Sequence, residues 1–564
     1  MIFLLNFSKR LFYILTAFAF LSCNNKNSTP SKELISGINL KRGPVISCGR
    51  TDKQFGKVDF DMTCNELSKD DFNLAIELLH SFEYDESEKV FAKIIDEDPT
   101  CAMAYWGVAM CNFHALWTPP TEAELIKGNK AITIAQTISN KSKRESAYID
   151  ALAIFYKDWN KTDHLTRCIS YEKEMEKIHA AYPEDKEAAI FYALALDASA
   201  KPTDKTFANQ KKAGSILNDI YPSEPDHPGI IHYIIHTYDY PGLAGLALTA
   251  ARKYSEVAPS SAHALHMPSH IFTRLGLWDE CIKSNLVSVA SAKCYAEQAG
   301  INGHWDEELH GMDYLVYAYL QKGKNNLAEE QLKYLKTFRN VYPVNFKVAY
   351  SFAAIPSRIC LENKNWNEAA GLQLYPLDFP WIKFPWQEAI FHFARLLGAA
   401  HLKDTNLAKN ELSKLKQLHD TLESQKDLYK SKQVEIQIKT GEAWIQYTSG
   451  QKQEALNEMK LAAEMEDSTE KHPVTPGEVL PARELLGDML FEEKQYESAL
   501  ISYEAVLQKS PNRFNSLFGA GRAAEKMGNR QKARDYYKQL AIINDATKSD
   551  RPELIAIQSF LTKK

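Results

Sequence analysis

Histidine is concentrated in one part of this 564-residue chain. Half of the sixteen histidines lie between residues 227 and 310. They are His227, His232, His236, His263, His266, His270, His304 and His310. Imidazole is a common ligand of transition metals and a common hydrogen-bonding group in protein interiors, so the spacing of these residues decides which chemistry they can do.

Two histidine pairs have the spacing of neighbours on one helix face. His232 and His236 are four residues apart, and so are His266 and His270. His310 has a carboxylate, Asp313, three residues later. Side chains at these spacings lie above one another on a helix. Each imidazole pair can therefore reach a single transition-metal ion.

A carboxylate can complete such a site or orient one of its rings. Asp239 follows His232 by seven residues, which places it on the same helix face. The candidate ligand or metal pocket therefore consists of His232, His236, Asp239, His266, His270, His310 and Asp313. The chain has no HExxH sequence, so the zinc-protease arrangement is not predicted, and no catalytic residue is predicted.

Two other interpretations of these histidines stay open, namely helix packing and a polar pocket for a ligand other than a metal. A packed imidazole often bonds a backbone carbonyl. Pro268 bears on the choice. A helix that began at Pro268 would leave His266 outside it. A helix that begins near residue 262 and kinks at Pro268 would keep His266 and His270 together.

Four further residues have packing as their favoured interpretation. His80 and His114 lie near tryptophans in the first helical units and are expected between helices rather than on a binding surface. Trp381 and Trp386 lie among prolines, which predicts a rigid aromatic loop. A packed loop is favoured there over a sugar-binding or peptide-binding lip.

The elements that must position these residues are helical repeats. Near the C-terminus, a set of small, aromatic and proline residues occurs at the places typical of a 34-residue tetratricopeptide (TPR) unit, and part of it recurs 34 residues later. The first set is Leu486, Gly487, Ala499, Tyr503 and Pro511, and the second is Gly521, Ala533 and Tyr537. The small residues allow two helices to approach closely, and the aromatic residues fill the space between neighbouring units.

The rest of the chain reads as amphipathic helices, and strand-type alternation is almost absent. Capping-box spacings at Thr121 and Ser142 predict two helix starts. We expect an all-α, TPR-like solenoid of antiparallel helix pairs. The expected divisions are a signal peptide (1–22), a tether and irregular lead-in (23–64), divergent TPR-like repeats (65–440) with a histidine-rich middle (227–313), and C-terminal TPR repeats (441–564) with the clearest units at 480–513 and 514–547.

Several short strings resemble a group of bacterial tetratricopeptide-repeat proteins. They are AYWG from Ala104, DHPG from Asp226, HYIIH from His232, ALHMPSH from Ala264, HPVTP from His472 and PNRFN from Pro511. The resemblance covers most of the chain after the signal peptide. It implies an all-helical fold and does not indicate a particular substrate.

The N-terminus has the pattern of a secretory signal. Lys9 and Arg10 precede the apolar run 11–21, which is too short to span a bilayer. The sequence FLSC that ends at Cys23 resembles a bacterial lipobox of the looser kind found in Bacteroidetes lipoproteins. This implies lipidation of Cys23 and attachment to the cell envelope, most simply the outer membrane. Cleavage would remove Lys9 and Arg10 and change the net charge from −5 to −7.

An exported chain can form disulfides. Cys48 and Cys64 are the favoured pair because both lie in the irregular lead-in, and most other cysteines are expected to be buried. No CxxC sequence is present, which argues against a zinc–thiolate site.

Composition narrows the functional classes. The chain has 67 basic and 72 acidic residues and no run of lysine and arginine, so no nucleic-acid partner is predicted. The leading hypothesis is a non-catalytic, lipid-anchored scaffold that binds a peptide or protein in the envelope, with membrane contact through the lipid alone. A metal-dependent enzyme or metal-binding protein that uses the histidines is one alternative, with a transition metal as cofactor. A SusD-like nutrient-binding lipoprotein is the other.

Overall fold

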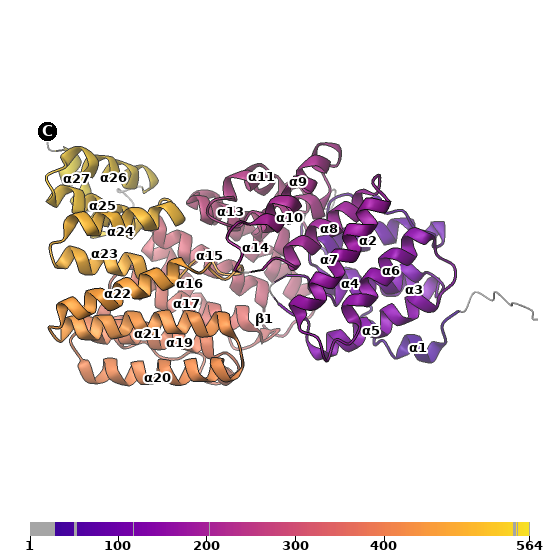
Figure 1. The fold of residues 1–564 in the computed structure, drawn as a ribbon, viewed down its shortest axis with the longest axis horizontal. Coiled ribbons are helices and arrows are strands. Elements are labelled where there is room, and N and C mark those ends of the chain that lie inside the picture. Colours follow the sequence, from indigo (N-terminus) through magenta and orange to yellow (C-terminus); the bar gives the residue numbers. More distant parts are fainter. Residues whose placement is uncertain are drawn as a thin grey trace, which may run out of the picture.

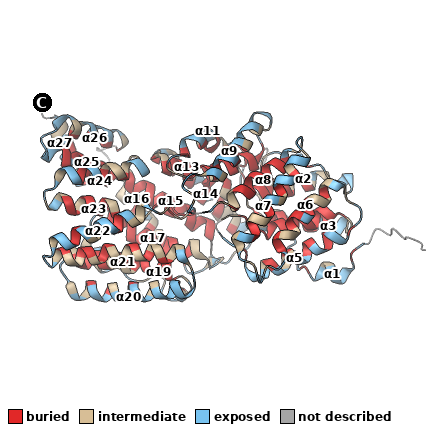
Figure 2. Ribbon diagram, in the orientation of Figure 1, coloured by how far each residue is buried: buried red, intermediate tan, exposed pale blue. Residues whose placement is uncertain are grey.

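The computed structural model describes residues 29–49, 54–116, 118–201, 203–544, 549 and 551–562. The expected signal peptide and Cys23 lie outside these residues. Within them the protein is built from helices, as predicted, and the strands are two residues long. Consecutive helices pack side by side in an elongated stack (Figure 1). Buried residues run along its interior (Figure 2).

The first group of helices is α1 (Lys32–Ser36), η1 (Glu66–Ser68), α2 (Lys69–His80), α3 (Tyr84–Glu97), α4 (Ala102–Cys111), α5 (Glu122–Thr137), α6 (Lys143–Tyr156), α7 (His164–Ala181) and α8 (Lys186–Ala198). Helices α5 and α6 begin at the two predicted capping boxes. The side chains of Thr121 and Ser142 accept bonds from the backbone N–H groups three residues later, and Glu124 and Glu145 bond back to the caps.

The central group carries the histidine-rich region. Its elements are α9 (Ala208–Ile220), η2 (Tyr221–Ser223), α10 (Pro228–Thr237), η3 (Ala244–Ala247), α11 (Leu248–Val257), α12 (Ala262–His266), α13 (Pro268–Leu275), α14 (Trp278–Gln298), β1 (His304–Trp305), α15 (Asp306–Gln321), α16 (Asn325–Leu335), β2 (Val341–Tyr342), α17 (Phe346–Glu362), α18 (Trp366–Ala370) and η4 (Trp381–Lys383). Strands β1 and β2 pair in parallel.

The last group is a regular stack of antiparallel pairs, on the left of Figure 1. Its helices are α19 (Pro385–His401), α20 (Thr405–Ser424), α21 (Leu428–Thr448), α22 (Lys452–Asp467), α23 (Ala482–Glu492), α24 (Tyr496–Lys509), α25 (Phe514–Lys526), α26 (Arg530–Ile543) and α27 (Pro552–Thr562). None of the helices in the described part of the chain is both long enough and apolar enough to cross a membrane.

The repeat residues near the C-terminus pack as the sequence predicts. The Tyr503 ring lies between two glycines of neighbouring units: an added Cβ would come within 2.8 Å of it at Gly487 and 2.5 Å at Gly519. Tyr537 occupies the same kind of space at Gly521, where the distance would be 2.3 Å. A Cβ at any of these glycines would overlap the ring, so helix spacing and aromatic size are matched.

The predicted disulfide between Cys48 and Cys64 is wrong. The structure pairs Cys48 with Cys294 on α14, and Cys64 with Cys101 at the start of α4. The lead-in runs along the helical body instead of folding back on itself, and Gly49 lies against the Pro259 backbone. The lead-in cysteines therefore face different helices. The four free cysteines of the described residues are buried, as expected: Cys111, Cys168, Cys281 and Cys360.

The connection between α22 and α23, residues 468–481, reaches back into the centre of the molecule. There Lys471 contacts the Asp239 carboxylate, and the Gly477 carbonyl accepts a 2.8 Å bond from Arg358 on α17. Trp381 and Trp386 are buried, which confirms that they are packed, but Trp386 lies on helix α19 rather than in a loop.

Candidate metal centre

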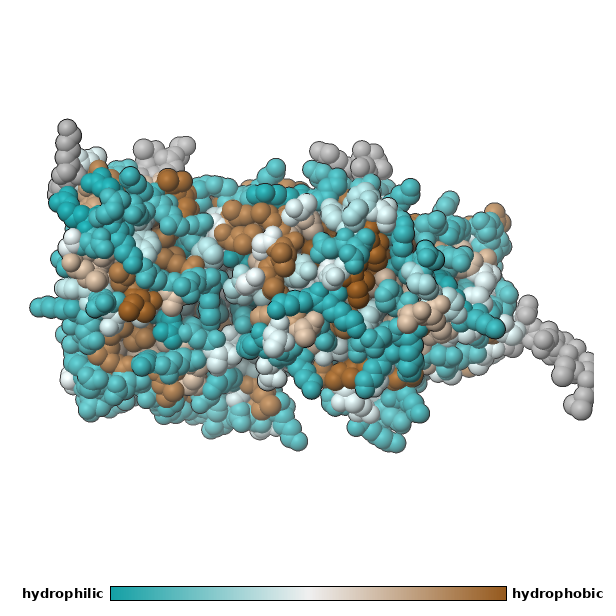
Figure 3. Space-filling view, turned by 45° about the horizontal axis from the view of Figure 1, so that its top comes forward, coloured by the Kyte–Doolittle hydropathy of each residue, from teal (hydrophilic) through white to brown (hydrophobic). Residues whose placement is uncertain are grey.

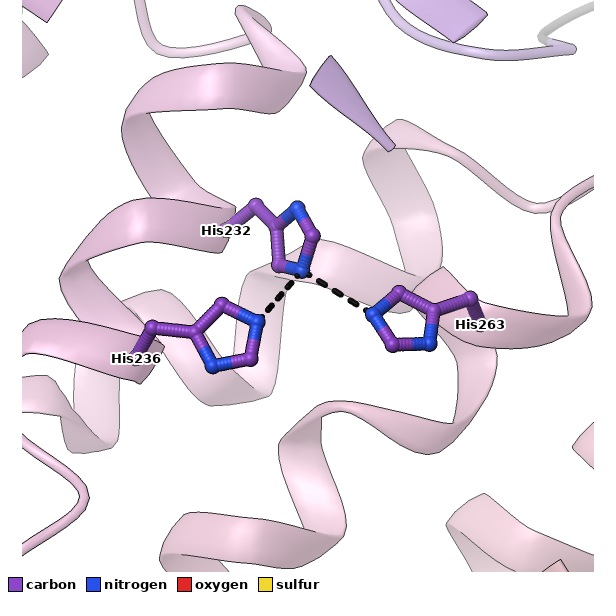
Figure 4. Close-up of side chains that lie close together, drawn as sticks. All are labelled: His232, His236 and His263. Atoms are coloured by element: carbon purple, nitrogen blue, oxygen red, sulfur yellow. Dashed lines mark hydrogen bonds between the residues drawn. The ribbon is translucent and has the colours of Figure 1, made fainter. Parts of the chain in front are cut away.

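The histidine-rich region folds into two groups of three imidazoles. The first triad is His232 and His236 on α10 with His263 on α12. Figure 4 shows the three rings converging. The Nε2 atom of His232 lies 2.9 Å from Nε2 of His236 and 3.2 Å from Nε2 of His263. On its other side, His232 Nδ1 donates a 2.6 Å bond to the His80 carbonyl.

The second triad is His266 on α12, His270 on α13 and His310 on α15. Its three ligand-type nitrogens lie within 4.8 Å of one another. The Nε2 atoms of His266 and His270 are 3.2 Å apart. The ring of His310 lies against that of His266, with centroids 4.2 Å apart.

Pro268 breaks the helix between His266 and His270 without separating them. Helix α12 ends at His266 and α13 begins at Pro268, while Met267 between them keeps right-handed helical angles. The direction of the chain is therefore almost continuous. The kinked helix predicted from about residue 262 is confirmed, and the spacing of four still brings both imidazoles to one face.

Hydrogen bonds fix which nitrogen carries the proton in two rings of the second triad, His266 and His270. His266 Nδ1 lies 2.6 Å from Asn285 Oδ1, and the Asn285 amide nitrogen donates to the Cys281 carbonyl. The oxygen of Asn285 therefore faces the ring, and His266 Nδ1 is the donor. His270 Nδ1 likewise donates to the Asp239 carboxylate at 3.1 Å. In a neutral imidazole this leaves a lone pair on each Nε2 atom.

Burial keeps these imidazoles neutral. It lowers the pKa of His232, His236, His266 and His310 well below the usual 6.5, and neighbouring imidazoles lower it further. Burial also lowers the pKa of His270, against the opposing effect of Asp239. At neutral pH the nitrogen lone pairs are therefore available as metal ligands.

The predicted carboxylates take different places. Asp239 orients His270 and is held by Arg274, whose Nε donates to it at 2.8 Å, and by Lys471 at 3.2 Å. Burial would raise the pKa of Asp239, but Lys471 and Arg274 lower it well below its usual range. Asp313, predicted in the same pocket, forms a buried ion pair with Arg358 instead and joins neither triad.

Sequence reasoning left two sets of residues out of the pocket. His263 was not assigned to it, although it lies three residues before His266 on α12, a spacing that marks one helix face. The second set, the His80 group, consists of His80, Glu187 and His227. Its members lie on or next to three helices far apart in sequence, so no spacing could have revealed it. His80 is buried between helices, as expected.

The hydrogen bonds of the His80 group can all form at once. The Glu187 carboxylate accepts from His80 Nε2 at 3.0 Å and from His227 Nε2 at 2.8 Å. The remaining nitrogens accept bonds from the Tyr233 hydroxyl at 2.9 Å and the Ile230 backbone N–H at 3.4 Å. This group is satisfied by the protein alone. One side of it lines a surface cavity of about 600 Å³, at Glu187 and His227.

No protein-family model matches this chain, and no curated protein matches it. Several solved structures have a similar run of helices at low identity. The human IFIT1 dimer with PPP-AAAA is 13% identical over 83% of this chain and 89% of that one, with a TM-score of 0.32. The Cut9–Hcn1 complex matches at 12% identity over 87% and 95%, with a TM-score of 0.27. Naa15/Naa10 bound to HypK-THB matches at 13% over 88% and 74%, with a TM-score of 0.23.

These likenesses assign no function. The fold and the site define the class: an all-α, TPR-like solenoid of antiparallel helix pairs with two histidine triads at its centre, one partly buried and one fully buried.

Proposed function

We propose that this protein binds a transition-metal ion through the second triad, His266, His270 and His310. The observation that carries the proposal is the 3.2 Å approach of two Nε2 lone pairs, on His266 and His270. Both Nδ1 atoms already donate elsewhere, so neither Nε2 has a hydrogen to share. Two facing lone pairs in a buried site repel each other, whereas a cation between them is attracted to both.

The surroundings of the triad are those of a metal site. Ligating imidazoles usually donate their second nitrogen to a carboxylate or amide oxygen, which fixes the ring and makes it a better ligand. Asp239 and Asn285 do this for His270 and His266. Three neutral nitrogen donors suit zinc, copper, nickel or cobalt, and three protein ligands leave a coordination position open.

The test is metal content of the full chain, purified without chelators and measured by elemental analysis. We expect bound transition metal in the wild type and its loss from this triad in His270→Ala. His304→Ala is the matched control, because His304 lies in the same region and bonds Glu308 rather than either triad. Wild-type protein that stays metal-free after exposure to Zn²⁺, Cu²⁺, Ni²⁺ and Co²⁺ would refute the proposal.

We also propose that the protein is exported and lipid-anchored through Cys23, at the outer membrane. The two disulfides, Cys48–Cys294 and Cys64–Cys101, support export because such bonds persist in oxidising compartments. Labelled palmitate should be incorporated into the wild type and not into Cys23→Ser, and the variant should leave the membrane fraction. Equal labelling of both would refute the anchor.

Binding of a peptide or protein partner is the second candidate function. Exposed apolar side chains on alternate helices of the C-terminal stack favour it: Leu461 on α22, Ile501 on α24 and Ile542 on α26. Brown areas interrupt the polar surface of the molecule in Figure 3. In-cell crosslinking should give an adduct that Ile501→Glu with Ile542→Glu abolishes. An adduct unchanged in that variant would refute these residues as the contact.

A further inference from the structure

The first triad differs from the second in that only one of its lone pairs is fixed by a hydrogen bond to another part of the protein. His232 Nδ1 donates to the His80 carbonyl, so His232 Nε2 carries a lone pair. That single lone pair faces two imidazole nitrogens, of His236 at 2.9 Å and of His263 at 3.2 Å. It can accept one good hydrogen bond, whereas an ion at the centre of the three nitrogens would be bound by all of them.

A carboxylate also stands behind one ring of this triad. Glu307 Oε2 lies 3.9 Å from His263 Nδ1, on the side away from the other two imidazoles. Glu307 is in turn paired with Lys347 on α17. This repeats the arrangement at His270, where Asp239 is paired with Arg274 and Lys471. Each triad therefore has an ion-paired carboxylate next to one of its imidazoles.

The two triads are adjacent. Helix α12 is five residues long and supplies His263 to one triad and His266 to the other. Across the gap, the ring centroids of His236 and His270 are 6.2 Å apart. Two ions bound by these rings would be close neighbours in one buried site.

An aromatic ring covers the first triad. The Phe82 ring centroid lies 4.4 Å from that of His232, 5.7 Å from that of His236 and 5.8 Å from that of His263. Phe82 itself is partly exposed, as are His236 and His263. It also has a φ of +58°, in the left-handed region that disfavours bulky residues.

The turn that holds Phe82 recurs along the chain with other residues. Seven other three-residue helix connections place a residue with positive φ in the same middle position, and each is lysine or glycine. They are Gly323, Lys364, Lys403, Lys426, Gly450, Lys494 and Gly528. The aromatic residue therefore occurs in this type of turn only where the turn lies over the first triad. Strain of this kind persists where the side chain has a task.

We propose that the protein holds two transition-metal ions side by side, one in each triad, and that Phe82 covers the outer ion. This inference rests on the proposed function and extends it from one ion to a two-ion centre. The occupants are first-row divalent ions that accept imidazole ligands, and Co²⁺ is the probe.

The test is Co²⁺ stoichiometry at saturation, measured on the full chain with circular dichroism as a check of folding. We expect two equivalents in the wild type and in the His304→Ala control, and one in His263→Ala and in His270→Ala. His236→Gln replaces His263→Ala should the latter unfold. One equivalent in the wild type, whichever variant removes it, overturns the two-ion centre and leaves the proposed function standing. No bound Co²⁺ or other transition metal in any sample overturns both.

Proximity has its own readout. Protein loaded with two equivalents of Cu²⁺ should give an electron paramagnetic resonance spectrum broadened by interaction between the ions. His263→Ala and His270→Ala should each give the sharp spectrum of an isolated ion. A wild-type spectrum equal to the sum of the two variant spectra would overturn the adjacency.

Phe82→Lys and Phe82→Gly test the cover with the residues that the other turns carry, so the turn should tolerate both. We expect two bound ions in each, with release to a chelator at least tenfold faster from the first triad. An unchanged release rate would overturn the role of Phe82.

Discussion

The His80 group and the second triad are both fully buried and rich in histidine, but their hydrogen bonds differ. In the His80 group a carboxylate stands between two imidazoles, and each ring nitrogen has a compatible partner. In the second triad, two nitrogens that both carry lone pairs face each other. A cluster of ligand-type residues is therefore informative only after its protons have been assigned, because the same composition can be complete or incomplete without an ion.

The largest expected effect is on stability at the His80 group. Glu187→Gln removes the charge and leaves one acceptor for two imidazole N–H groups, so unfolding should become easier by about 3 kcal/mol, because each hydrogen bond to a charged group contributes about 1.5–3 kcal/mol. Chemical denaturation measures this. Metal content should stay at the wild-type level, and a loss of metal in folded Glu187→Gln would mean that this group is itself a ligand site.

Removal of metal should lower the stability of the protein only through the triads, and not through the His80 group. A ligand that binds only the folded protein stabilises it by about 2.7 kcal/mol at a hundredfold excess over its Kd. Thermal unfolding with and without chelator should show this difference in the wild type and in His227→Gln. It should be reduced in His270→Ala. Equal chelator sensitivity of the wild type and His270→Ala would remove the distinction between the groups.

Asn285→Ala tests the proton assignment itself. It removes the acceptor that holds His266 Nδ1–H. Loss of such an orienting partner typically weakens metal binding by about 10-fold to 100-fold. Competition with a chromophoric chelator measures the affinity. Unchanged affinity would mean that the second triad does not depend on this tautomer.

The smallest expected effect is on the pH dependence of stability. It follows from a difference in pKa between two buried carboxylates on α8, Glu187 and Asp197. Burial would raise the pKa of Glu187, but His227 and His80 outweigh it, and the pKa lies below its usual value. Asp197 has one hydroxyl partner, Thr237, and burial raises its pKa to about 8. Folded protein then binds the Asp197 proton more tightly than unfolded protein, so stability falls as pH rises from about 4 to about 8.

Asp197→Asn abolishes this dependence. Relative to the wild type, the variant should gain about 1 kcal/mol as pH rises from 6 to 7, because a pKa difference costs up to about 1.4 kcal/mol per pH unit. Denaturation at the two pH values measures it. A difference that stays constant with pH would show that Asp197 is ionised in the folded protein.

Contacts between residues close together in the sequence could be predicted, because they follow from regular spacings. Spacings of four located both histidine pairs, and a 34-residue recurrence located the Tyr503 and Tyr537 positions. Long-range relations were not predictable. Glu187 meets His80 across 107 residues and Cys48 meets Cys294 across 246, and no periodicity encodes such contacts. The prediction that Asp313 lies in the histidine pocket was wrong for a different reason. Its spacing from His310 is that of one helix face, but Arg358 on α17 binds its carboxylate instead.

The connection between α22 and α23 gives the centre a thermodynamic link to the C-terminal stack. Asp239 touches His270 on one side and Lys471, 232 residues away in sequence, on the other. Any event on the C-terminal helices that displaces this connection alters how His270 is held. Coupling between two sites is reciprocal. Suppose that a partner bound to the C-terminal helices weakens ion binding tenfold. The ion-loaded protein would then bind that partner tenfold less tightly, so metal occupancy would control binding at the second site.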